Sequence, residues 1–365
     1  MSKCKYNAAL IGTGRIGFTL GFDSKREQPA SHAMALKENR RIKLVAACDR
    51  DPTKLNYFHR FNRKPHLFND YSYLFATTKV DIVTIAVNEN AHLEAALAAI
   101  RARPRLVILE KPVALSVADG MKIFNEAKTL NIPVLINHER RFAEDYKLAK
   151  EYIKQIGQIQ TINARLDSGL YVYNPDAEAT GEYCLWHDGT HLVDIVSYLL
   201  EQDDNEKANQ ALYDAEDSGE RKILKNARIT QILYDENSKI VRSINVHLQS
   251  DNCNDVNIFI SGKSRFFGFE LDVIGTEGRI RIGNGIFEFS KRVQSKLYTG
   301  FYSLEKDELI KMPKKTRYFS NMVKNAVGFL DSKERLKSTL ANGLRTLRVL
   351  EDIKNQIKEF DELPF

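Results

Sequence analysis

A strand that runs directly into a glycine-rich turn is the feature that most limits how this chain can fold. The apolar run "AALI" at 8–11 is followed by "GTGRIG" at 12–17, a G-x-G-x-x-G placed where a helix should begin. The first glycine permits a tight turn, the second lets the backbone approach a pyrophosphate, and the third lets the helix lie close to the sheet. Backbone amides and the positive helix end can then hold the anion. The motif predicts a dinucleotide-binding loop whose contacting residues are Gly12, Gly14, Arg15, Ile16 and Gly17.

The surrounding pattern supports this interpretation. Five apolar runs, "NAALIG", "IKLVAACD", "VDIVTIAV", "RLVILE" and "IPVLIN", are separated by segments with helical spacing such as "NAHLEAALAAIRAR". Strands that do not alternate and are spaced by helices indicate a parallel sheet covered on both faces. We therefore predict a doubly wound α/β domain of the Rossmann type over residues 1–150.

The second strand ends with an acid that bears on the choice of cofactor. Asp49 is placed to accept hydrogen bonds from an adenine-ribose diol, which favours NAD. Arg50 follows at once and could instead face the 2′-phosphate of NADP. Asp49 also lies farther beyond Gly17 than the roughly 20 residues usual for this motif. The segment "GFDSKREQPASHA" at 21–33 is therefore interpreted as an insertion at or within the first helix, either a solvated loop or a segment that reaches the active site through Arg26 or His32.

After about residue 155 the pattern changes to alternating strands with short connections. These include "IQTINARLDSGLYVY", "ARITQILYD", "KIVRSINVHLQS" and "FGFELDVIG". Period-two alternation indicates a largely antiparallel sheet with one face covered. We predict an α+β domain with an open sheet over 151–340, with a main helix at 182–201, and a final helix at 341–365 that packs back on the first domain.

Composition narrows the class of protein. A length of 365 residues favours two domains, and 43% hydrophobic with 28% charged residues is typical of a globular protein. The net charge of +6 is far from the clustered basic footprint of a nucleic-acid binder. The four cysteines show no paired metal spacing, and no apolar run approaches the roughly 18 residues that span a bilayer. With no signal-peptide pattern, the sequence predicts a cytoplasmic protein without nucleic-acid or membrane partners.

A lysine emerges at the end of the predicted strand "RLVILE". Ligands of open α/β sheets bind outside the carboxyl ends of the strands, so the charge of Lys111 should point toward the cofactor crevice. There it could hydrogen-bond a substrate hydroxyl or carbonyl. The alternative is a surface ion pair between Glu110 and Lys111, worth at most about 1 kcal/mol.

The order of these motifs resembles a known family. GTGRIG, a strand-terminal acid, "VNENAHLEAALAAI", "EKP", "NHERRF", "IGQIQ" and a helix rich in Asp and His look like the glucose-fructose oxidoreductase, inositol dehydrogenase and MocA (Gfo/Idh/MocA) family of NAD(P)-dependent oxidoreductases. The resemblance covers nearly the whole chain, and EKP is its most specific element. It implies that Lys111 is the catalytic lysine. Further cofactor contacts are expected from Asn88, His92 and Glu110, and substrate contacts from Asn137 and Arg141. Asn88-Glu89 replaces the Thr/Ser-Pro pair usual in relatives.

The stretch "CLWHDGTHLVD" at 184–194 holds two histidines four positions apart. The family's helix typically reads D-x-G-x-H, so His191 matches the general acid/base, while His187 stands in place of the acid. Histidine suits the removal of a hydroxyl proton at neutral pH. His187 is then expected to relay a proton or to bind substrate, together with Asp188 and Trp186.

Other interpretations of this stretch remain open. His187 and His191 are spaced for zinc, but no third ligand or H-E-x-x-H is present, so no metal is predicted. Both histidines could be core residues without chemistry, Trp186 could serve only in packing, and Asp194 could support His191 or be structural. The favoured interpretation is a homodimeric or homotetrameric NAD(P)-dependent dehydrogenase or reductase acting on a sugar, inositol or nucleotide-sugar. A catalytically silent cofactor-binding regulator is the alternative.

Overall fold

The computed structural model describes residues 5–169, 183–201, 221–236 and 240–361, and contacts divide them into two compact units. The first unit holds 5–143, Arg221 and 315–347. The second holds 144–169, 183–201, 222–236, 240–314 and 348–361. The first unit thus ends at Ala143 rather than at residue 150, and it takes up 315–340, which the sequence assigned to the second domain. The final helix is shared, with its division after Leu347.

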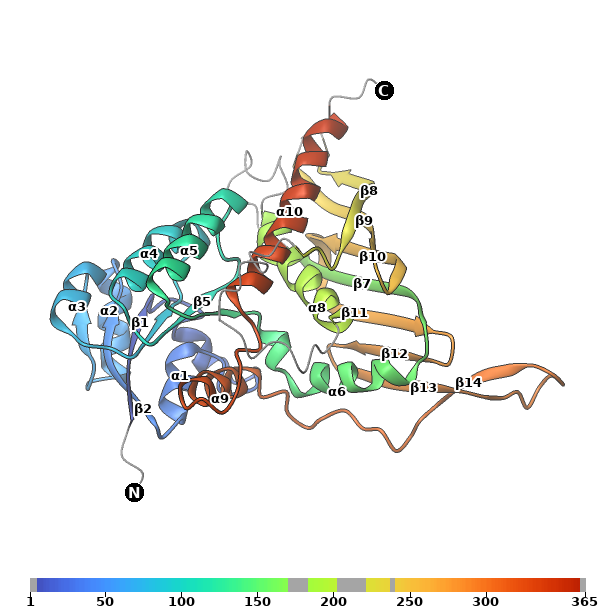
Figure 1. Ribbon diagram of the computed structural model, residues 1–365, viewed down its shortest axis with the longest axis horizontal. Coiled ribbons are helices and arrows are strands. Elements are labelled where there is room, and N and C mark those ends of the chain that lie inside the picture. The colour runs from blue at the N-terminus through green and yellow to red at the C-terminus, as the bar shows by residue number, and fades with distance from the viewer. Residues whose placement is uncertain (1–4, 170–182, 202–220, 237–239, 362–365) are drawn as a thin grey trace. The chain divides into compact units, whose positions relative to one another are not determined.

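Six parallel strands form the sheet of the first unit, in the order β3-β2-β1-β4-β5-β6. Figure 1 labels β1, β2 and β5 of this sheet. They are β1 (Tyr6–Ile11), β2 (Ile42–Cys48), β3 (His66–Phe68), β4 (Ile82–Ile85), β5 (Leu106–Glu110) and β6 (Val134–Asn137). Every residue of β4 and β5 is buried, as a sheet covered on both faces requires. The order reverses between β1 and β4, which confirms the predicted doubly wound Rossmann fold. The sequence analysis missed β3, because three residues are too few to carry a periodic signal.

Side-chain caps decide where several helices of this unit begin. Asp51 accepts hydrogen bonds from the amides of Thr53 and Lys54, and Pro52 occupies the first helical position. Ser116 accepts from the amide of Asp119 in the same way. Such caps satisfy amides that have no partner within the helix. The helices are α1 (His32–Glu38), α2 (Pro52–Phe61), α3 (Tyr71–Thr77), α4 (His92–Arg101), α5 (Val117–Leu130) and α9 (Tyr318–Leu330).

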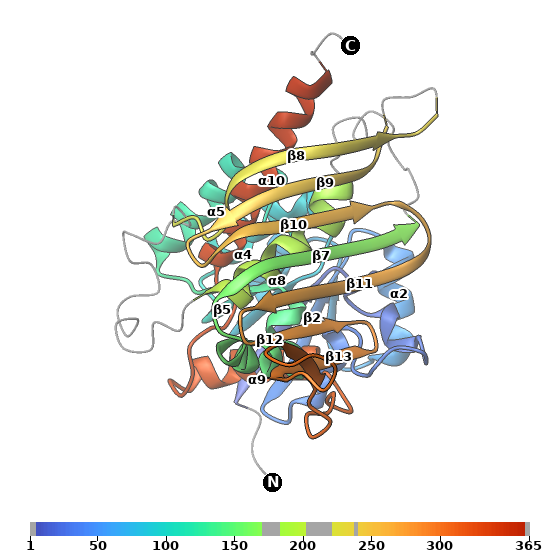
Figure 2. The ribbon, with the colours of Figure 1, turned by 90° about the vertical axis from the view of Figure 1, so that its right-hand side faces the viewer.

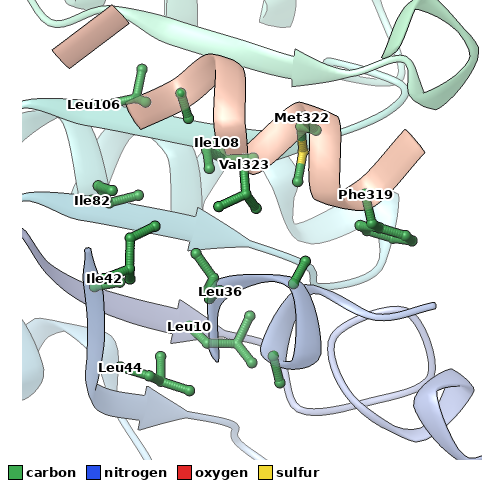
Figure 3. Close-up of a cluster of buried hydrophobic side chains, with 14 of the residues drawn as sticks. Leu10, Leu36, Ile42, Leu44, Ile82, Leu106, Ile108, Phe319, Met322 and Val323 are labelled. Carbon is green, nitrogen blue, oxygen red and sulfur yellow. The ribbon is translucent and has the colours of Figure 1, made fainter. Parts of the chain in front are cut away.

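A buried cluster fixes α9 to the sheet although it lies about 180 residues beyond the last strand, β6. Phe319, Met322 and Val323 of α9 pack with Leu36 of α1 and with apolar residues of the strands (Figure 3). Burying a side chain of this kind contributes about 1.5–3 kcal/mol. The first unit therefore depends on a helix from the last fifth of the chain.

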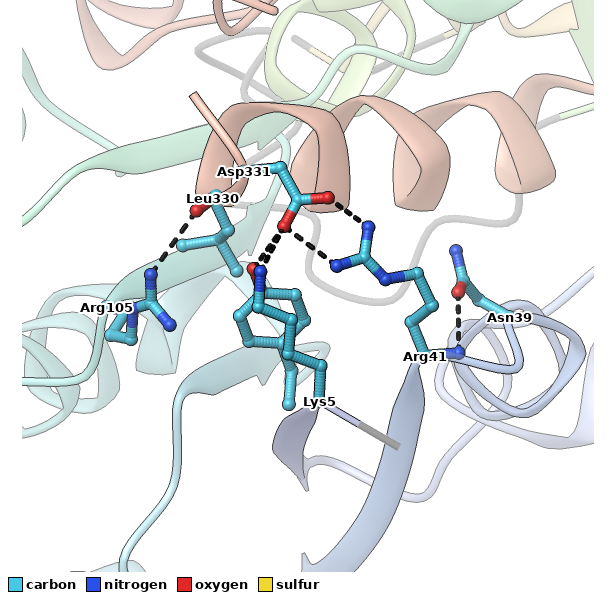
Figure 4. A network of polar contacts seen from close by, with 7 residues as sticks. Lys5, Asn39, Arg41, Arg105, Leu330 and Asp331 are labelled. Carbon is cyan, nitrogen blue, oxygen red and sulfur yellow. Dashed lines mark hydrogen bonds and ion pairs between the residues drawn. The ribbon is translucent and has the colours of Figure 1, made fainter. Parts of the chain in front are cut away.

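A charged network reinforces the same connection at the end of α9 (Figure 4). The Asp331 carboxylate accepts hydrogen bonds from Lys5 Nζ at 2.8 Å and from Tyr6 Oη at 2.6 Å. Both terminal nitrogens of Arg41 also donate to it, one at 2.8 Å. These hydrogen bonds, led by those from Arg41, hold the pKa of Asp331 well below its usual range.

An insertion interrupts the helix that follows the glycine loop. The carbonyl of Ile16, which would accept from residue 20 in a continuous α-helix, accepts instead from the amide of His32, twelve positions later. The carbonyl of Gly17 accepts from Ala33 in the same way. Without these twelve positions Asp49 would follow Gly17 at the usual spacing of about 20 residues. The hydrogen-bond pattern of the helix thus resumes in α1 after the insertion.

Eight strands form a mostly antiparallel sheet in the second unit, in the order β14-β13-β12-β11-β7-β10-β9-β8. They are β7 (Ile159–Gly169), β8 (Lys225–Tyr234), β9 (Val241–Ser250), β10 (Cys253–Ser261), β11 (Lys263–Gly275), β12 (Gly278–Gly283), β13 (Ile286–Gln294) and β14 (Tyr302–Lys306). Within this sheet, β7 and β10 are the only described strands that pair in parallel. This sheet confirms the predicted α+β domain, although β13 and β14 were missed.

One face of this sheet is covered and the other is open. Ile162, Ala164 and Leu166 of β7 are buried on the covered face, where α8 (Thr190–Leu200) contacts β7 and α6 (Glu144–Tyr152) contacts β12. Figure 2 shows the open face toward the viewer, with α8 behind the strands. The open face contains a shallow hollow of about 540 Å³. The last helix of the chain is α10 (Leu340–Asp361).

In the part of the chain that the structure describes, no helix has the length and apolar character needed to cross a membrane.

Candidate active site

The three glycines of the loop after β1 have different surroundings. Gly12 has a φ of +95°, and a Cβ there would lie 2.4 Å from the carbonyl oxygen of Ala86. A Cβ at Gly17 would lie 2.0 Å from the oxygen of Gly12, whereas one at Gly14 would meet no atom within 4 Å. The chain itself therefore requires glycine at 12 and 17. At Gly14 the backbone borders open space at the start of a turn, whose first amide hydrogen bonds come from Phe18 and Thr19 to the Gly14 carbonyl.

Asp49 ties the end of β2 to this loop. Its Oδ2 accepts hydrogen bonds from the amide of Thr13 at 2.7 Å and from the Thr13 hydroxyl at 3.0 Å. Its Oδ1 accepts from the amide of Asp51 at 3.0 Å. Arg50, by contrast, is exposed, 3.6 Å from Glu94, and lies over the ring of Tyr71. The carboxylate is thus held beside the glycine loop, and the arginine beside it lies in solvent.

A buried carboxylate stands at the carboxyl end of β5. Oε1 of Glu110 lies 2.6 Å from Nε2 of His32 and accepts a second hydrogen bond from Nδ2 of Asn137, also at 2.6 Å. All three side chains are buried. Burial opposes ionisation of Glu110, but the hydrogen bonds from His32 and Asn137 and the positive charge of Lys111 outweigh it and lower its pKa. Lys111 follows directly and is half-buried.

His92 secures the turn that carries the lysine. Its Nδ1 lies 2.6 Å from the carbonyl oxygen of Pro112, and its Nε2 lies 3.2 Å from that of Val87. The ring is buried, and burial lowers the pKa of His92. The ring thus joins α4 to the Glu110–Pro112 turn. Asn88, at the end of the β4 loop, is exposed and begins the short helix η2 (Glu89–Ala91).

The histidine stretch of the second unit differs from the continuous helix that the sequence predicts. Tyr183–Gly189 forms a π-helical segment, η5, and regular α-helix begins only at Thr190. Single π-helical turns occur often at functional sites. His187 lies on the π-helical segment and His191 in the first turn of α8, so the two are not on one α-helical stripe as the sequence spacing indicates.

Asp188 orients His187. Nδ1 of His187 lies 3.0 Å from Oδ1 of Asp188, whose Oδ2 accepts a hydrogen bond from the hydroxyl of Ser168 at 2.8 Å. Asp188 is buried, whereas the His187 side chain is 43% exposed. His191 is half-buried on the same segment of chain. Asp188 is therefore a residue that holds His187 in place, and it lies too deep to be a surface contact.

Two further predicted substrate residues are buried. Trp186 is 2% exposed, and Lys354 of α10 lies over its ring. Arg141 is also 2% exposed, in the short helix η3 (Glu139–Phe142). Asp194 is buried within α8. Among the described residues, no group of three or more His, Cys, Asp or Glu side chains is arranged to hold a metal ion.

The Gfo/Idh/MocA model, described as an oxidoreductase family with an NAD-binding Rossmann fold, matches residues 6–138. The N-terminal domain of the chain thus has the sequence pattern of this family.

Among the relatives of the chain is inositol 2-dehydrogenase of Salmonella paratyphi B, which is 30% identical over 143 residues, 37% of this chain and 40% of that enzyme. The first curated relatives are thus matched over about two fifths of their length.

Solved structures extend the likeness in fold to almost the whole chain. The WlbA dehydrogenase of Bordetella pertussis, in complex with NADH and UDP-GlcNAcA, has a TM-score of 0.71 at 16% identity and covers 99% of both chains. An oxidoreductase of Agrobacterium radiobacter, in complex with NAD⁺, L-tartaric acid and magnesium, has a TM-score of 0.69 at 18% identity and covers 95% of this chain and 94% of its own.

The residues of the glycine loop fit a dinucleotide. The space at Gly14 is where a Cβ would stand between the backbone and a diphosphate, and the Asp49 carboxylate lies beside the same loop. The sequence analysis identified the glycines, Asp49 and Lys111. It did not identify Thr13 or Ser168 as partners of Asp49 and Asp188, because no local pattern reports a contact between distant residues. His32 appeared only as one open possibility of the insertion.

Proposed function

We propose that the chain is an NAD(P)-dependent oxidoreductase that moves hydride between nicotinamide and a hydroxyl or carbonyl carbon of a sugar, inositol or nucleotide-sugar, with NAD favoured over NADP. The observation that carries this proposal is the shared edge of the parallel sheet. Gly14 follows β1 and Lys111 follows β5, and the carboxyl ends of parallel strands meet at one edge near the switch between β1 and β4. The inositol 2-dehydrogenase relative and the sugar-nucleotide complex of the WlbA dehydrogenase support the substrate class.

The residues of the chain have distinct roles in this reaction. Oxidation of a secondary alcohol breaks a C–H bond and an O–H bond and forms a C=O bond. NAD(P)⁺ would supply the acceptor for the hydride. His191 accepts the hydroxyl proton as general base, and Lys111 stabilises the negative charge that develops on the same oxygen. His187, oriented by Asp188, hydrogen-bonds the substrate or passes the proton onward, and Asn137 and Arg141 shape the surroundings of the reacting group.

The proposal is tested with the purified protein, NAD⁺ or NADP⁺, and a panel of inositols, sugars and nucleotide-sugars, by following nicotinamide absorbance with and without EDTA. We expect turnover that EDTA does not change. His191→Ala and Lys111→Ala should each lower kcat by about 10²- to 10⁴-fold while leaving the Kd for NADH unchanged. Lys122→Ala, an exposed lysine of α5 paired with Asp119, is the matched control and should keep full activity.

Two results would contradict this function. Tight NADH binding without turnover on any member of the panel favours a cofactor-binding regulator of the same fold. Full activity in His191→Ala removes that histidine from the mechanism.

A further inference from the structure

The insertion after the glycine loop delivers one side chain to the centre of the first unit. His32, where the helix resumes, is fully buried, and its ring meets Phe319 of α9 edge-on at 5.1 Å between ring centres. The amide of His32 donates to the carbonyl of Ile16, which fixes the backbone at this point. Both its backbone and its ring are thus held within the first unit.

The only polar contact of the His32 ring within the described part of the chain is with Glu110. Nε2 lies 2.6 Å from Oε1 of Glu110, and Nδ1 has no hydrogen-bond partner among the described residues. A ring protonated on Nε2 alone donates to the carboxylate and leaves only a lone pair unpaired on Nδ1. This arrangement is cheaper than burying an N–H group without an acceptor.

Glu110 directly precedes Lys111 in the chain. The position of the Glu110 backbone therefore fixes the point from which the Lys111 side chain extends. A buried carboxylate must be hydrogen-bonded to stay ionised. The groups facing it are His32 from α1, Asn137 from β6, Lys111 directly after β5 and His92 from α4. If the His32 donor were lost, Asn137 would be the neutral side chain still donating a hydrogen bond to Oε1 of Glu110. The Glu110 carboxylate would then take up a proton at a higher pH.

We propose that His32 is a positioning residue that, by holding Glu110 ionised and fixed at the end of β5, sets the charge and placement of Lys111. The effect on catalysis rests on the proposed function. The effect on Lys111 rests only on the hydrogen bond between His32 and Glu110. The inserted segment thereby acquires a role in the proposed active site, because it ends at His32, whose ring contacts Glu110 next to Lys111.

The test compares His32→Met, which keeps apolar volume and removes the donor, with His32→Gln, which retains a donor at similar reach. In the protein without cofactor, acetic anhydride labelling of Lys111 is followed by mass spectrometry between pH 6 and 10. When Glu110 is protonated, the ammonium group of Lys111 loses the neighbouring negative charge that stabilises it and gives up its proton more readily. His32→Met should therefore label about 3- to 10-fold faster than wild type at a given pH, and His32→Gln should label like wild type.

Activity provides a second readout on any substrate found in the panel. His32→Met should lower kcat by about 10- to 100-fold and move the acid limb of the kcat profile to higher pH, with the Kd for NADH unchanged. His32→Gln should restore both. Phe319→Leu, which removes the ring packed on His32 without touching its hydrogen bond, is the packing control. It should lower Tm and leave the labelling rate and the acid limb in place.

The failure of this inference is distinguishable from failure of the proposed function. Unchanged labelling of Lys111 and an unmoved acid limb in His32→Met overturn the role of His32 even if the enzyme is active. Absence of turnover in the wild type overturns the function, while the labelling still decides the role of His32. If His32→Met does not fold, Glu110→Gln must give the same faster labelling, and an unchanged rate there overturns the proposal.

Discussion

At the scale of single residues, the glycine loop contains positions where the fold requires glycine and one position where it does not. At Gly17 a methyl group would collide with the backbone of Gly12. At Gly14 the protein offers no atom for a methyl group to meet. Packing of the described residues therefore does not explain glycine at 14, and we propose that the approach of a diphosphate does.

This contrast gives a paired prediction. Gly14→Ala should leave stability within about 0.5 kcal/mol of wild type and weaken NADH binding about 10-fold or more, which corresponds to about 1.4 kcal/mol. Gly17→Ala should destabilise the fold by about 1–3 kcal/mol, because backbone must move to admit the methyl group. Thermal unfolding and fluorescence titration with NADH measure the two effects. Equal NADH affinity in Gly14→Ala and wild type would remove the diphosphate from this loop.

At the scale of elements, Asp331 joins three segments through one carboxylate. It follows α9 and contacts Arg41 before β2, together with Lys5 and Tyr6 at the start of β1. Its pKa is lower in the folded protein than the ordinary value of 3.8. The stability that it contributes is therefore fully present above pH 3.8 and is lost as the pH falls through the folded pKa.

Asp331→Asn tests this linkage. The variant should have a lower Tm than wild type at pH 7, and the difference should shrink as the pH is lowered below about 4. Asp352→Asn is the control, because its ion pair with Lys222 is half exposed on both sides and contributes little. Melting curves between pH 3 and 7 provide the measurement. A difference in Tm that stays constant across this range would contradict the assignment.

How well the sequence predicts a helix or strand depends on its length and on whether neighbouring residues in the sequence or tertiary contacts determine it. The long apolar strands β1, β2, β4 and β5 and their helices follow from periodicity, glycine and caps. The short strand β3 and the polar strand β14 give no such signal, since three residues show no period and all five residues of β14 are exposed. The π-helical segment before Thr190 and the hydrogen bond from His32 to Ile16 depend on tertiary contacts, which spacing alone does not report.

At the scale of the whole molecule, the open face of the eight-stranded sheet is the surface suited to a second copy of the chain. Its outward residues include Asn163, Asn257, Arg279 and Arg281, around the hollow of about 540 Å³. Arg279 pairs with Asp272, so the face carries both signs of charge and can match itself across a two-fold axis. We propose that this face forms a homo-oligomer.

The oligomer is tested by sedimentation velocity at micromolar concentration. The wild type should sediment as a dimer or larger species. Arg279→Glu with Arg281→Glu should yield monomers, because two acidic faces repel each other. Lys122→Glu on α5 changes charge away from this sheet and should keep the wild-type state. A monomeric wild type would exclude the proposed interface.

The interrupted helix after the glycine loop has a practical consequence. The insertion begins and ends within one helical turn, where the carbonyls of Ile16 and Gly17 accept hydrogen bonds from the amides of His32 and Ala33. Because both ends are anchored so close together, extra residues at the exposed tip of the insertion can be accommodated without displacing the glycine loop or the sheet. A foreign peptide or reporter spliced near its exposed tip at Ser24 and Lys25 would hang outside the folded body while the anchors stay as they are.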